Sequence, residues 1–251
     1  MRTNHMLLRS RDPLLRTGMI DGIARCGGSL LLSTTGQLDL LATLYGTDKS
    51  RRHHGYTEYY RRHLGYLRFK PITLVEIGVG GDADDSLGGA SLRMWRDYFF
   101  RGNIVGVDLH EKALRRLGPR VEVRQADQSS REDLEHLVRT ISTPAVIIDD
   151  GSHVPSHIRL TFDILFPSLA PGGWFIIEDL HTSFMEEFGG STDSDETTTV
   201  GLIGELAESV QVNDHVFSDV LGWMPEVHSE DVASVHVYPG ICFIEKCGDR
   251  S

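Results

Sequence analysis

The sequence predicts an α/β fold in which a doubly wound, mostly parallel seven-stranded sheet follows a helical N-terminal segment. Short apolar runs alternate with helical patterns from residue 72 onward, which is typical of parallel strands joined by helical crossovers. Two of the runs, at 145–148 and 174–177, are continuously apolar, as expected of strands buried on both faces. Near the C-terminus, Pro239 and Gly240 separate two alternating runs and predict an antiparallel hairpin that closes the sheet.

The chain divides into a helical N-terminal segment, residues 1–70, and an α/β domain, residues 71–251. Leucines at helical spacing occupy the first segment, and the polar, glycine-punctuated stretch 46–60 predicts an ordered loop. Strands are expected at 73–79, 103–108, 121–124, 145–149, 173–177, 232–238 and 241–245. Helices are expected at 91–100, near 111–117, and at 131–140, 155–169 and 202–211. The acidic, threonine-rich part of 181–200 has no core-forming pattern and predicts a loop, which we interpret as a lid over the acceptor.

The composition limits the classes of partner. The formal net charge of the 251 residues is −11, and such an acidic surface repels nucleic acids and anionic lipid surfaces. No apolar run approaches the roughly 18–20 residues that span a bilayer, and the N-terminus has no signal-peptide core, so we expect a cytoplasmic protein. The three cysteines have no metal-type spacing, and nothing indicates a disulfide scaffold.

The first predicted strand ends in a glycine loop. In an open α/β sheet, ligands bind beyond the carboxyl ends of the strands, and Gly78 and Gly80 would allow a ligand to approach the main chain closely. Three acids follow, Asp82, Asp84 and Asp85, which would repel a pyrophosphate and so disfavour a nicotinamide dinucleotide. A sulfonium methyl donor without phosphate would not be repelled. The loop by itself is nearly as typical of a plain structural turn.

Polar residues also end the second and third predicted strands. Asp108 is suitably placed to accept the ribose hydroxyls of an adenosine, and Asp127 and Gln128 are placed to bond an adenine amine. The alternative for each acid is an exposed residue that caps the next helix. Taken in order with the glycine loop, these residues favour an adenosine-containing cofactor.

Two acidic pairs end the fourth and fifth strands, Asp149-Asp150 and Glu178-Asp179. If these strands are neighbours, their ends lie roughly 5 Å apart. Carboxylates at that spacing repel by about 4 kcal/mol per pair at an effective dielectric near 20, so they need a counter-ion. Hard oxygen ligands without a nearby cysteine suit Mg²⁺ better than zinc. Acids that cap helices or face water are the alternative, but four carboxylates on two adjacent strand ends favour a metal site.

A histidine follows the first of these acidic pairs. Imidazole titrates near neutrality, so His153 is our candidate general base. A surface histidine at a helix N-terminus is the alternative. His181 is a second candidate base, ranked lower, and His157 is expected on the helix.

Several motifs resemble those of class I S-adenosylmethionine-dependent methyltransferases, namely 76–80, Asp108, Asp127 and the turn 169–173. Four more specific motifs, at 46–49, 88–95, 149–153 and 177–183, resemble the metal-dependent sugar O-methyltransferases of antibiotic biosynthesis. That group includes enzymes acting on the deoxysugars of mycinamicin and macrocin and a smaller rhamnose methyltransferase of the calicheamicin pathway. The resemblance covers about residues 43–183 and, more loosely, the C-terminal hairpin.

This resemblance implies a set of site residues. S-adenosylmethionine is the expected methyl donor, and Mg²⁺ or a similar divalent cation is the expected metal. Asp150 and His153 are the catalytic residues, with His153 as the base. The implied metal ligands are Asp150, Glu178 and Asp179, and the implied donor-binding residues are Glu76, Gly78, Gly80, Ser91, Asp108, Asp127, Gln128 and Asp149.

The predicted function is therefore O-methylation of a deoxysugar hydroxyl in natural-product biosynthesis. The macrolide-glycoside enzymes carry a large additional N-terminal domain, so the short helical segment here favours a smaller, rhamnose-like, nucleotide-linked acceptor. Residues 1–70 are interpreted as a cover over donor and acceptor, and assembly through their helices predicts a homo-oligomer. The alternatives are a metal-dependent catechol-like O-methyltransferase, a cephalosporin-hydroxylase-like protein and a non-catalytic S-adenosylmethionine-binding subunit. The carboxylate cluster disfavours the last, since a binding-only module does not need it.

Overall fold

Seven strands form one sheet in the order β3-β2-β1-β4-β5-β7-β6, which confirms the predicted doubly wound arrangement. The computed structural model describes residues 37–81, 83–114, 117–193, 197–212 and 231–249. The first five strands are parallel, and the last two form an antiparallel hairpin at one edge. The strands are β1 (Thr73–Ile77), β2 (Asn103–Asp108), β3 (Val121–Gln125), β4 (Val146–Asp149), β5 (Trp174–Ile177), β6 (Val232–Tyr238) and β7 (Ile241–Lys246).

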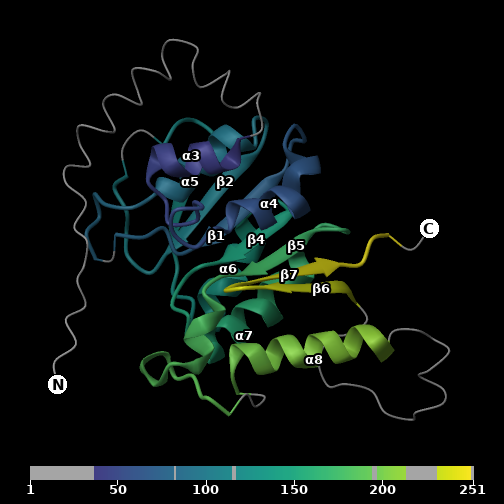
Figure 1. Cartoon of the computed structure of the whole chain (residues 1–251). Coiled ribbons are helices and arrows are strands. Elements are labelled where there is room, and N and C mark those ends of the chain that lie inside the picture. Colours follow the sequence, from purple (N-terminus) through teal and green to yellow (C-terminus); the bar gives the residue numbers. More distant parts are fainter. Residues whose placement is uncertain (1–36, 82, 115–116, 194–196, 213–230, 250–251) are drawn as a thin grey trace.

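Helices cover both faces of the sheet (Figure 1). On one face lie α3 (Leu38–Tyr45), α4 (Thr57–Leu64) and α5 (Ala90–Tyr98), and on the other lie α6 (Arg131–Thr140), α7 (Pro155–Leu165) and α8 (Thr199–Val212). Four short 3₁₀ helices complete the described structure: η1 (Gly65–Leu67), η2 (Phe166–Ser168), η3 (Leu180–Phe184) and η4 (Glu186–Phe188).

Two hydrophobic clusters, one on each face, hold these layers together. Neighbouring strand residues alternate between them, so Leu74 joins the cluster with α3, α4 and α5, while Val75 joins the cluster with α6, α7 and α8. The N-terminal helices are part of the first cluster, since Tyr60 packs edge-on against Trp95 and Phe243. The segment 37–67 is therefore packed onto the sheet beside the ends of its central strands.

The register of the central strands sets where the polar residues leave the sheet. Ile77, Asp149 and Ile177 lie side by side across β1, β4 and β5. The residues that follow them, among them Asp150 and Glu178, therefore emerge at the same edge. This confirms that the fourth and fifth strands are neighbours, which the predicted metal site requires.

Three expectations about local structure were wrong. Helix α4 begins at Thr57, inside the stretch 46–60 that was expected to be a loop. No helix forms in the described part of 111–117, where residues 111–114 are irregular because the Ala113 amide donates to the Asp85 carbonyl, at 2.8 Å, in place of a helical partner. The predicted loop at 181–200 is interrupted by η3 and η4 and ends where α8 begins at Thr199. The leucine pattern before residue 37 lies outside the described residues. Within the described ranges, no helix is both long and apolar enough to cross a bilayer.

Replacing Gly78 with alanine is expected to destabilise the protein by about 3 kcal/mol or more. Gly78 has φ 87°, and an added Cβ would lie 2.0 Å from the backbone oxygen of Asp150, so the loop after β4 would have to move. Gly80 is the matched control, with φ 72° and nothing within 4 Å of an added Cβ. Gly80→Ala should cost only the left-handed backbone strain of about 1–2 kcal/mol. Urea unfolding measures both, and equal losses would contradict the collision.

Candidate active site

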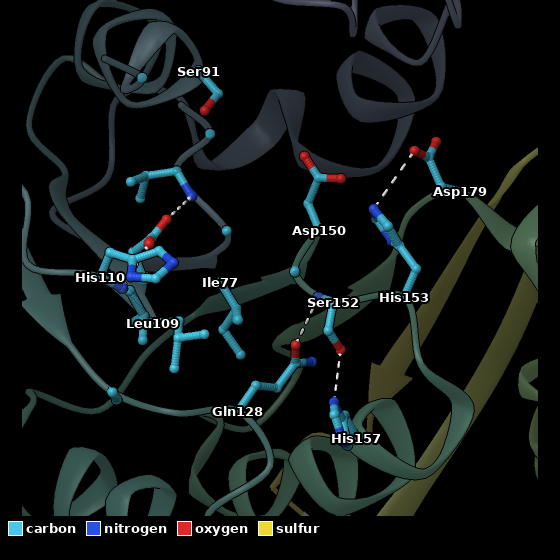
Figure 2. Close-up of a pocket in the computed structure, with 18 of the residues that line it drawn as sticks. Ile77, Ser91, Leu109, His110, Gln128, Asp150, Ser152, His153, His157 and Asp179 are labelled. Atoms are coloured by element: carbon cyan, nitrogen blue, oxygen red, sulfur yellow. Dashed lines mark hydrogen bonds and ion pairs between the residues drawn. The ribbon is translucent and has the colours of Figure 1, made fainter. Parts of the chain in front are cut away.

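A cavity of about 780 Å³ opens at the carboxyl ends of the parallel strands (Figure 2). Its walls come from the loops after β1, β2, β3, β4 and β5, from the start of α5 and from the stretch between α3 and α4. Nine of the predicted site residues line it: Gly78, Gly80, Ser91, Asp108, Asp127, Gln128, Asp150, His153 and Asp179. Three others, Glu76, Asp149 and Glu178, are buried behind its wall.

The end of β2 is tied to the glycine loop. One oxygen of the Asp108 carboxylate accepts a hydrogen bond from the Val79 amide at 3.2 Å, and the other accepts one from the His110 amide at 2.9 Å. Asp127, after β3, accepts bonds from the amide and hydroxyl of Ser129, which lower its pKa. Both carboxylates are thus oriented by hydrogen bonds at the cavity wall, as a polar ligand would require.

A buried network supports the loop that follows β4. Gln128 donates to both oxygens of Asp149 at 2.8 Å and accepts a bond from the Ser152 amide at 2.9 Å. Burial raises the pKa of Asp149 to about 7, against the bonds from Gln128. Asp149 therefore orients Gln128 from behind, while Gln128 itself faces the cavity. Ser152 is further bonded to Nδ1 of His157, on α7, at 2.9 Å (Figure 2).

Glu76 and Ser91 form a second buried pair beneath the glycine loop. The Ser91 hydroxyl donates to Oε2 of Glu76 at 2.8 Å. Burial raises the pKa of Glu76 to about 6, although the nearby Lys49 ammonium opposes the shift. Ser91 lines the cavity and Glu76 does not, so Glu76 orients the serine and neighbouring groups.

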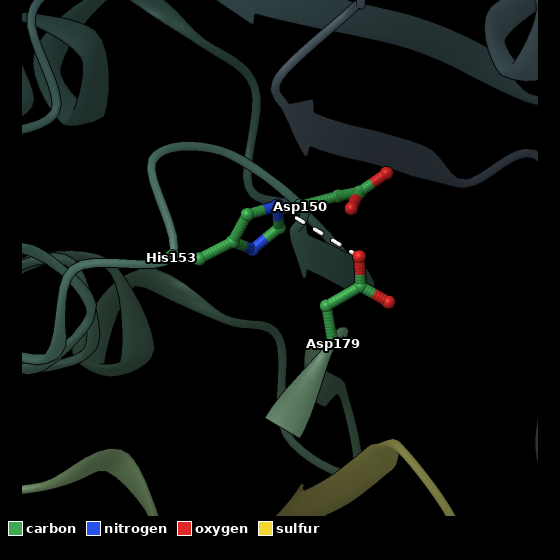
Figure 3. A group of neighbouring side chains, drawn as sticks. All are labelled: Asp150, His153 and Asp179. Atoms are coloured by element: carbon green, nitrogen blue, oxygen red, sulfur yellow. Dashed lines mark ion pairs between the residues drawn. The ribbon is translucent and has the colours of Figure 1, made fainter. Parts of the chain in front are cut away.

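Three side chains from the ends of β4 and β5 converge at one wall of the cavity (Figure 3). Asp150, His153 and Asp179 each offer an oxygen or nitrogen atom within 4.8 Å of the others. Nε2 of His153 lies 3.9 Å from Oδ2 of Asp179. His153 and Asp179 have φ 58° and 53°, and no other non-glycine residue in the described ranges has positive φ. These unusual conformations turn both side chains toward Asp150.

Glu178, the remaining predicted metal ligand, is held from the inner side. Its Oε2 accepts a bond from the Lys49 ammonium at 2.9 Å, and its Oε1 accepts a short bond from the Tyr60 hydroxyl. Burial and the neighbouring Asp150 raise its pKa well above the usual value. Burial also raises the pKa of Asp150, despite Lys49. A cation beside the two acids would favour their ionised forms.

The segment between α3 and α4 supplies polar partners that sequence reasoning treated only as a cover. Lys49 contacts Asp150 as well as Glu178, and the Tyr56 hydroxyl donates to Oδ1 of Asp179 at 2.8 Å. The available signal was a lysine in a glycine-punctuated loop upstream of a strongly acidic site. Periodicity could not find these contacts, because they join residues more than a hundred positions apart.

The site fits a hard divalent cation. Its ligand atoms at the cavity wall are carboxylate oxygens and one imidazole nitrogen, and oxygen ligands are those Mg²⁺ prefers. Nδ1 of His153 is buried and has no hydrogen-bond partner among the described residues, so this ring is not fixed by a structural bond on that side. The site can therefore bring a cation and a proton acceptor together beside a ligand-sized cavity.

Known proteins resemble the chain in sequence and fold. No family model matches the chain. The chain is 40% identical over 82% of its length to the 8-demethyl-8-alpha-L-rhamnosyl tetracenomycin-C 2'-O-methyltransferase of Streptomyces olivaceus, covering 53% of that protein. It is 36% identical over 89% of its length to the mycinamicin VI 2''-O-methyltransferase of Micromonospora griseorubida, covering 55%. The chain thus spans about half the length of these curated relatives.

A solved structure agrees with these relatives. The MycE methyltransferase of the mycinamycin biosynthetic pathway, in complex with Mg, SAH and mycinamycin VI, matches with a TM-score of 0.74 and 34% identity. The match covers 85% of this chain and 55% of the other. The similarity therefore includes most of the chain.

Proposed function

We propose that this chain, which has the class I methyltransferase fold and belongs to the sugar O-methyltransferases of antibiotic pathways, transfers a methyl group from S-adenosylmethionine to a sugar hydroxyl. One observation carries the proposal. Asp150, His153 and Asp179 meet at the wall of a cavity that begins at a glycine loop. A cavity for the donor and a cation site with a proton acceptor are the two parts that this reaction needs.

The donor would occupy the part of the cavity between the glycine loop and Gln128. Gly78 and Gly80 leave room for close approach to the main chain, and Asp108 and Asp127 present carboxylates to ribose and adenine. Ser91 lies on the side expected for the methionine end. Among the described residues, five aspartates line the cavity, Asp48, Asp108, Asp127, Asp150 and Asp179, and their negative charge suits a donor with a sulfonium and no phosphate.

A magnesium ion would be held at the cavity wall by Asp150 and Asp179, while Glu178, the third predicted ligand, lies behind them with its oxygens bonded to Lys49 and Tyr60. Bound there, the ion would supply a Lewis acid that lowers the pKa of the reacting sugar hydroxyl. His153 then accepts the hydroxyl proton as the oxygen forms its bond to the methyl carbon and the bond from that carbon to sulfur breaks.

The acceptor is a deoxysugar, and the charge of the cavity bears on whether that sugar is linked to a nucleotide or to an aglycone. A nucleotide-linked sugar carries a diphosphate, which requires basic partners. Lys49 is the only lysine or arginine among the described residues that line the cavity, and three acids surround it. Exposed Phe184, at the end of η3, and Met185, directly after it, follow Asp179 in the chain and would suit an apolar aglycone. We therefore favour a glycoside as acceptor over the nucleotide-linked sugar.

An acceptor screen with labelled S-adenosylmethionine tests the function. We expect methyl transfer to a rhamnosyl glycoside to exceed transfer to a nucleotide-linked deoxysugar or a catechol by about a hundred-fold, close to 3 kcal/mol. Preference for the catechol would replace the sugar with a phenol as acceptor class. Calorimetry with S-adenosylhomocysteine is the companion measurement. If neither donor product binding nor methylation is detected, the proposal fails.

A further inference from the structure

Lys49 places one buried ammonium group among three carboxylates from three neighbouring strands. Its Nζ lies 2.6 Å from Oδ2 of Asp150, 2.9 Å from Oε2 of Glu178 and 3.5 Å from Oε1 of Glu76. The lysine side chain is 1% exposed. Because β1, β4 and β5 are adjacent, the ammonium spans the ends of the central part of the sheet.

This ammonium and the acids depend on each other. The ammonium donates hydrogen bonds to Asp150 and Glu178, and the Glu76 carboxylate, at 3.5 Å, contacts it as an ion pair without a hydrogen bond. A buried charge without a partner is strongly unfavourable, whether it is the lysine or an acid. Glu178 has Lys49 on one oxygen and Tyr60 on the other, so both of its oxygens are bonded by protein groups. The acids are thus compensated on their inner side by the chain itself.

The cavity side of the cluster differs. Asp150 and Asp179 line the cavity, and Asp179 is contacted by the Tyr56 hydroxyl at 2.8 Å and by two imidazoles at 3.9 Å. No lysine or arginine of the described structure forms an ion pair with Asp179. Lys49 therefore neutralises the buried carboxylates, namely Glu76, Glu178 and one oxygen of Asp150. The carboxylate oxygens that face the cavity, on Asp150 and Asp179, are left for an external cation.

We propose that Lys49 is a positioning residue that serves as a permanent internal counter-ion for these carboxylates. It holds Asp150 and Glu178 in place before a divalent cation arrives, so that the cation is required on the cavity side only. The inference rests on the proposed metal site. The same ammonium repels the incoming cation, so the site binds magnesium less tightly than the bare acids would, and the ion can exchange.

Lys49→Met removes the counter-ion and tests this inference without an activity assay. In excess EDTA the variant is expected to melt roughly 10 °C below the wild type, because the buried acids are left unpaired. Magnesium chloride should restore most of that loss while shifting the wild type little. Calorimetry should show magnesium binding to the variant at least about tenfold tighter than to the wild type.

Arg51→Met is the matched control, since it removes a positive charge from the same segment at an exposed position. It should shift neither the melting temperature in EDTA nor the magnesium affinity. If Lys49→Met does not fold in either condition, Lys49→Met/Glu76→Gln removes one acid with the lysine. That double variant should fold and still gain more from magnesium than the wild type.

The outcomes separate the two proposals. An equal magnesium-induced shift in the wild type and in the folded Lys49 variant would overturn the counter-ion role, as would weaker magnesium binding by the variant. In both cases magnesium binding by the wild type would leave the proposed function intact. If the wild type binds no magnesium in calorimetry, the metal site fails, and the counter-ion inference fails with it.

Discussion

Replacing His153 with alanine is expected to lower the turnover of methyl transfer by about 10²–10⁴-fold, the usual range for loss of a general base. Binding of S-adenosylhomocysteine should change little, because the donor contacts proposed here come from the glycine loop and from Asp108 and Asp127. The imidazole of His153 lines the cavity, and its Nε2 faces Asp179. Single-turnover kinetics and calorimetry on the same variant measure the two effects separately.

His181→Ala is the comparison, since His181 is the lower-ranked candidate base. Its side chain is exposed, stacks at 6.3 Å on His54, and is not among the residues that line the cavity. It should keep most of the activity. A large loss of donor affinity in His153→Ala would contradict the base role. Magnesium binding by this variant should also be measured, because His153 lies within ligand distance of both aspartates.

Removing divalent cations with excess EDTA is expected to reduce methyl transfer about a thousand-fold or more. This corresponds to about 4 kcal/mol of transition-state stabilisation, a size typical of a bound metal that polarises an oxygen. Added Mg²⁺ should restore the rate. The physical reason is that Asp150 and Asp179 repel each other and the deprotonating hydroxyl unless a cation neutralises them.

Asp179→Asn should reproduce most of this loss, and raising magnesium should recover part of it. Glu187→Gln is the matched control, since Glu187 is an exposed acid of the same segment and does not line the cavity. Full activity in EDTA, or equal losses in the two variants, would remove the cation from the chemistry.

Much of the fold could be predicted because the spacing of apolar residues in the sequence follows which side of each helix or strand is buried. The runs at 103–108 and 131–140 coincide with β2 and α6, and the hairpin strands β6 and β7 differ from expectation by one residue at most. The helix expected near 111–117 was wrong because a bond from Ala113 to a distant loop competes with helical pairing. A single sequence carries no signal for such a contact.

The site was predictable where it depends on strand ends and unpredictable where it depends on packing. Asp150 and Asp179 follow adjacent strands, so their convergence could be inferred from topology alone. The position of Glu178 behind the wall, and its bonds to Lys49 and Tyr60, result from how the segment 37–67 docks on the sheet. That docking is a tertiary event between residues far apart in the sequence. The metal-ligand roles of Asp150, Glu178 and Asp179 therefore remain predictions.

The left-handed backbone at His153 and Asp179 lowers the stability of the folded protein while it places two side chains at the candidate site. Each such residue costs on the order of 1–3 kcal/mol, and glycine would adopt the same backbone without that cost. A chain selected for heat resistance alone would thus be expected to lose both functional side chains at these positions. Engineering for thermostability should leave residues 153 and 179 untouched and seek its gains at members of the two hydrophobic clusters that do not line the cavity, such as Phe162 and Phe166.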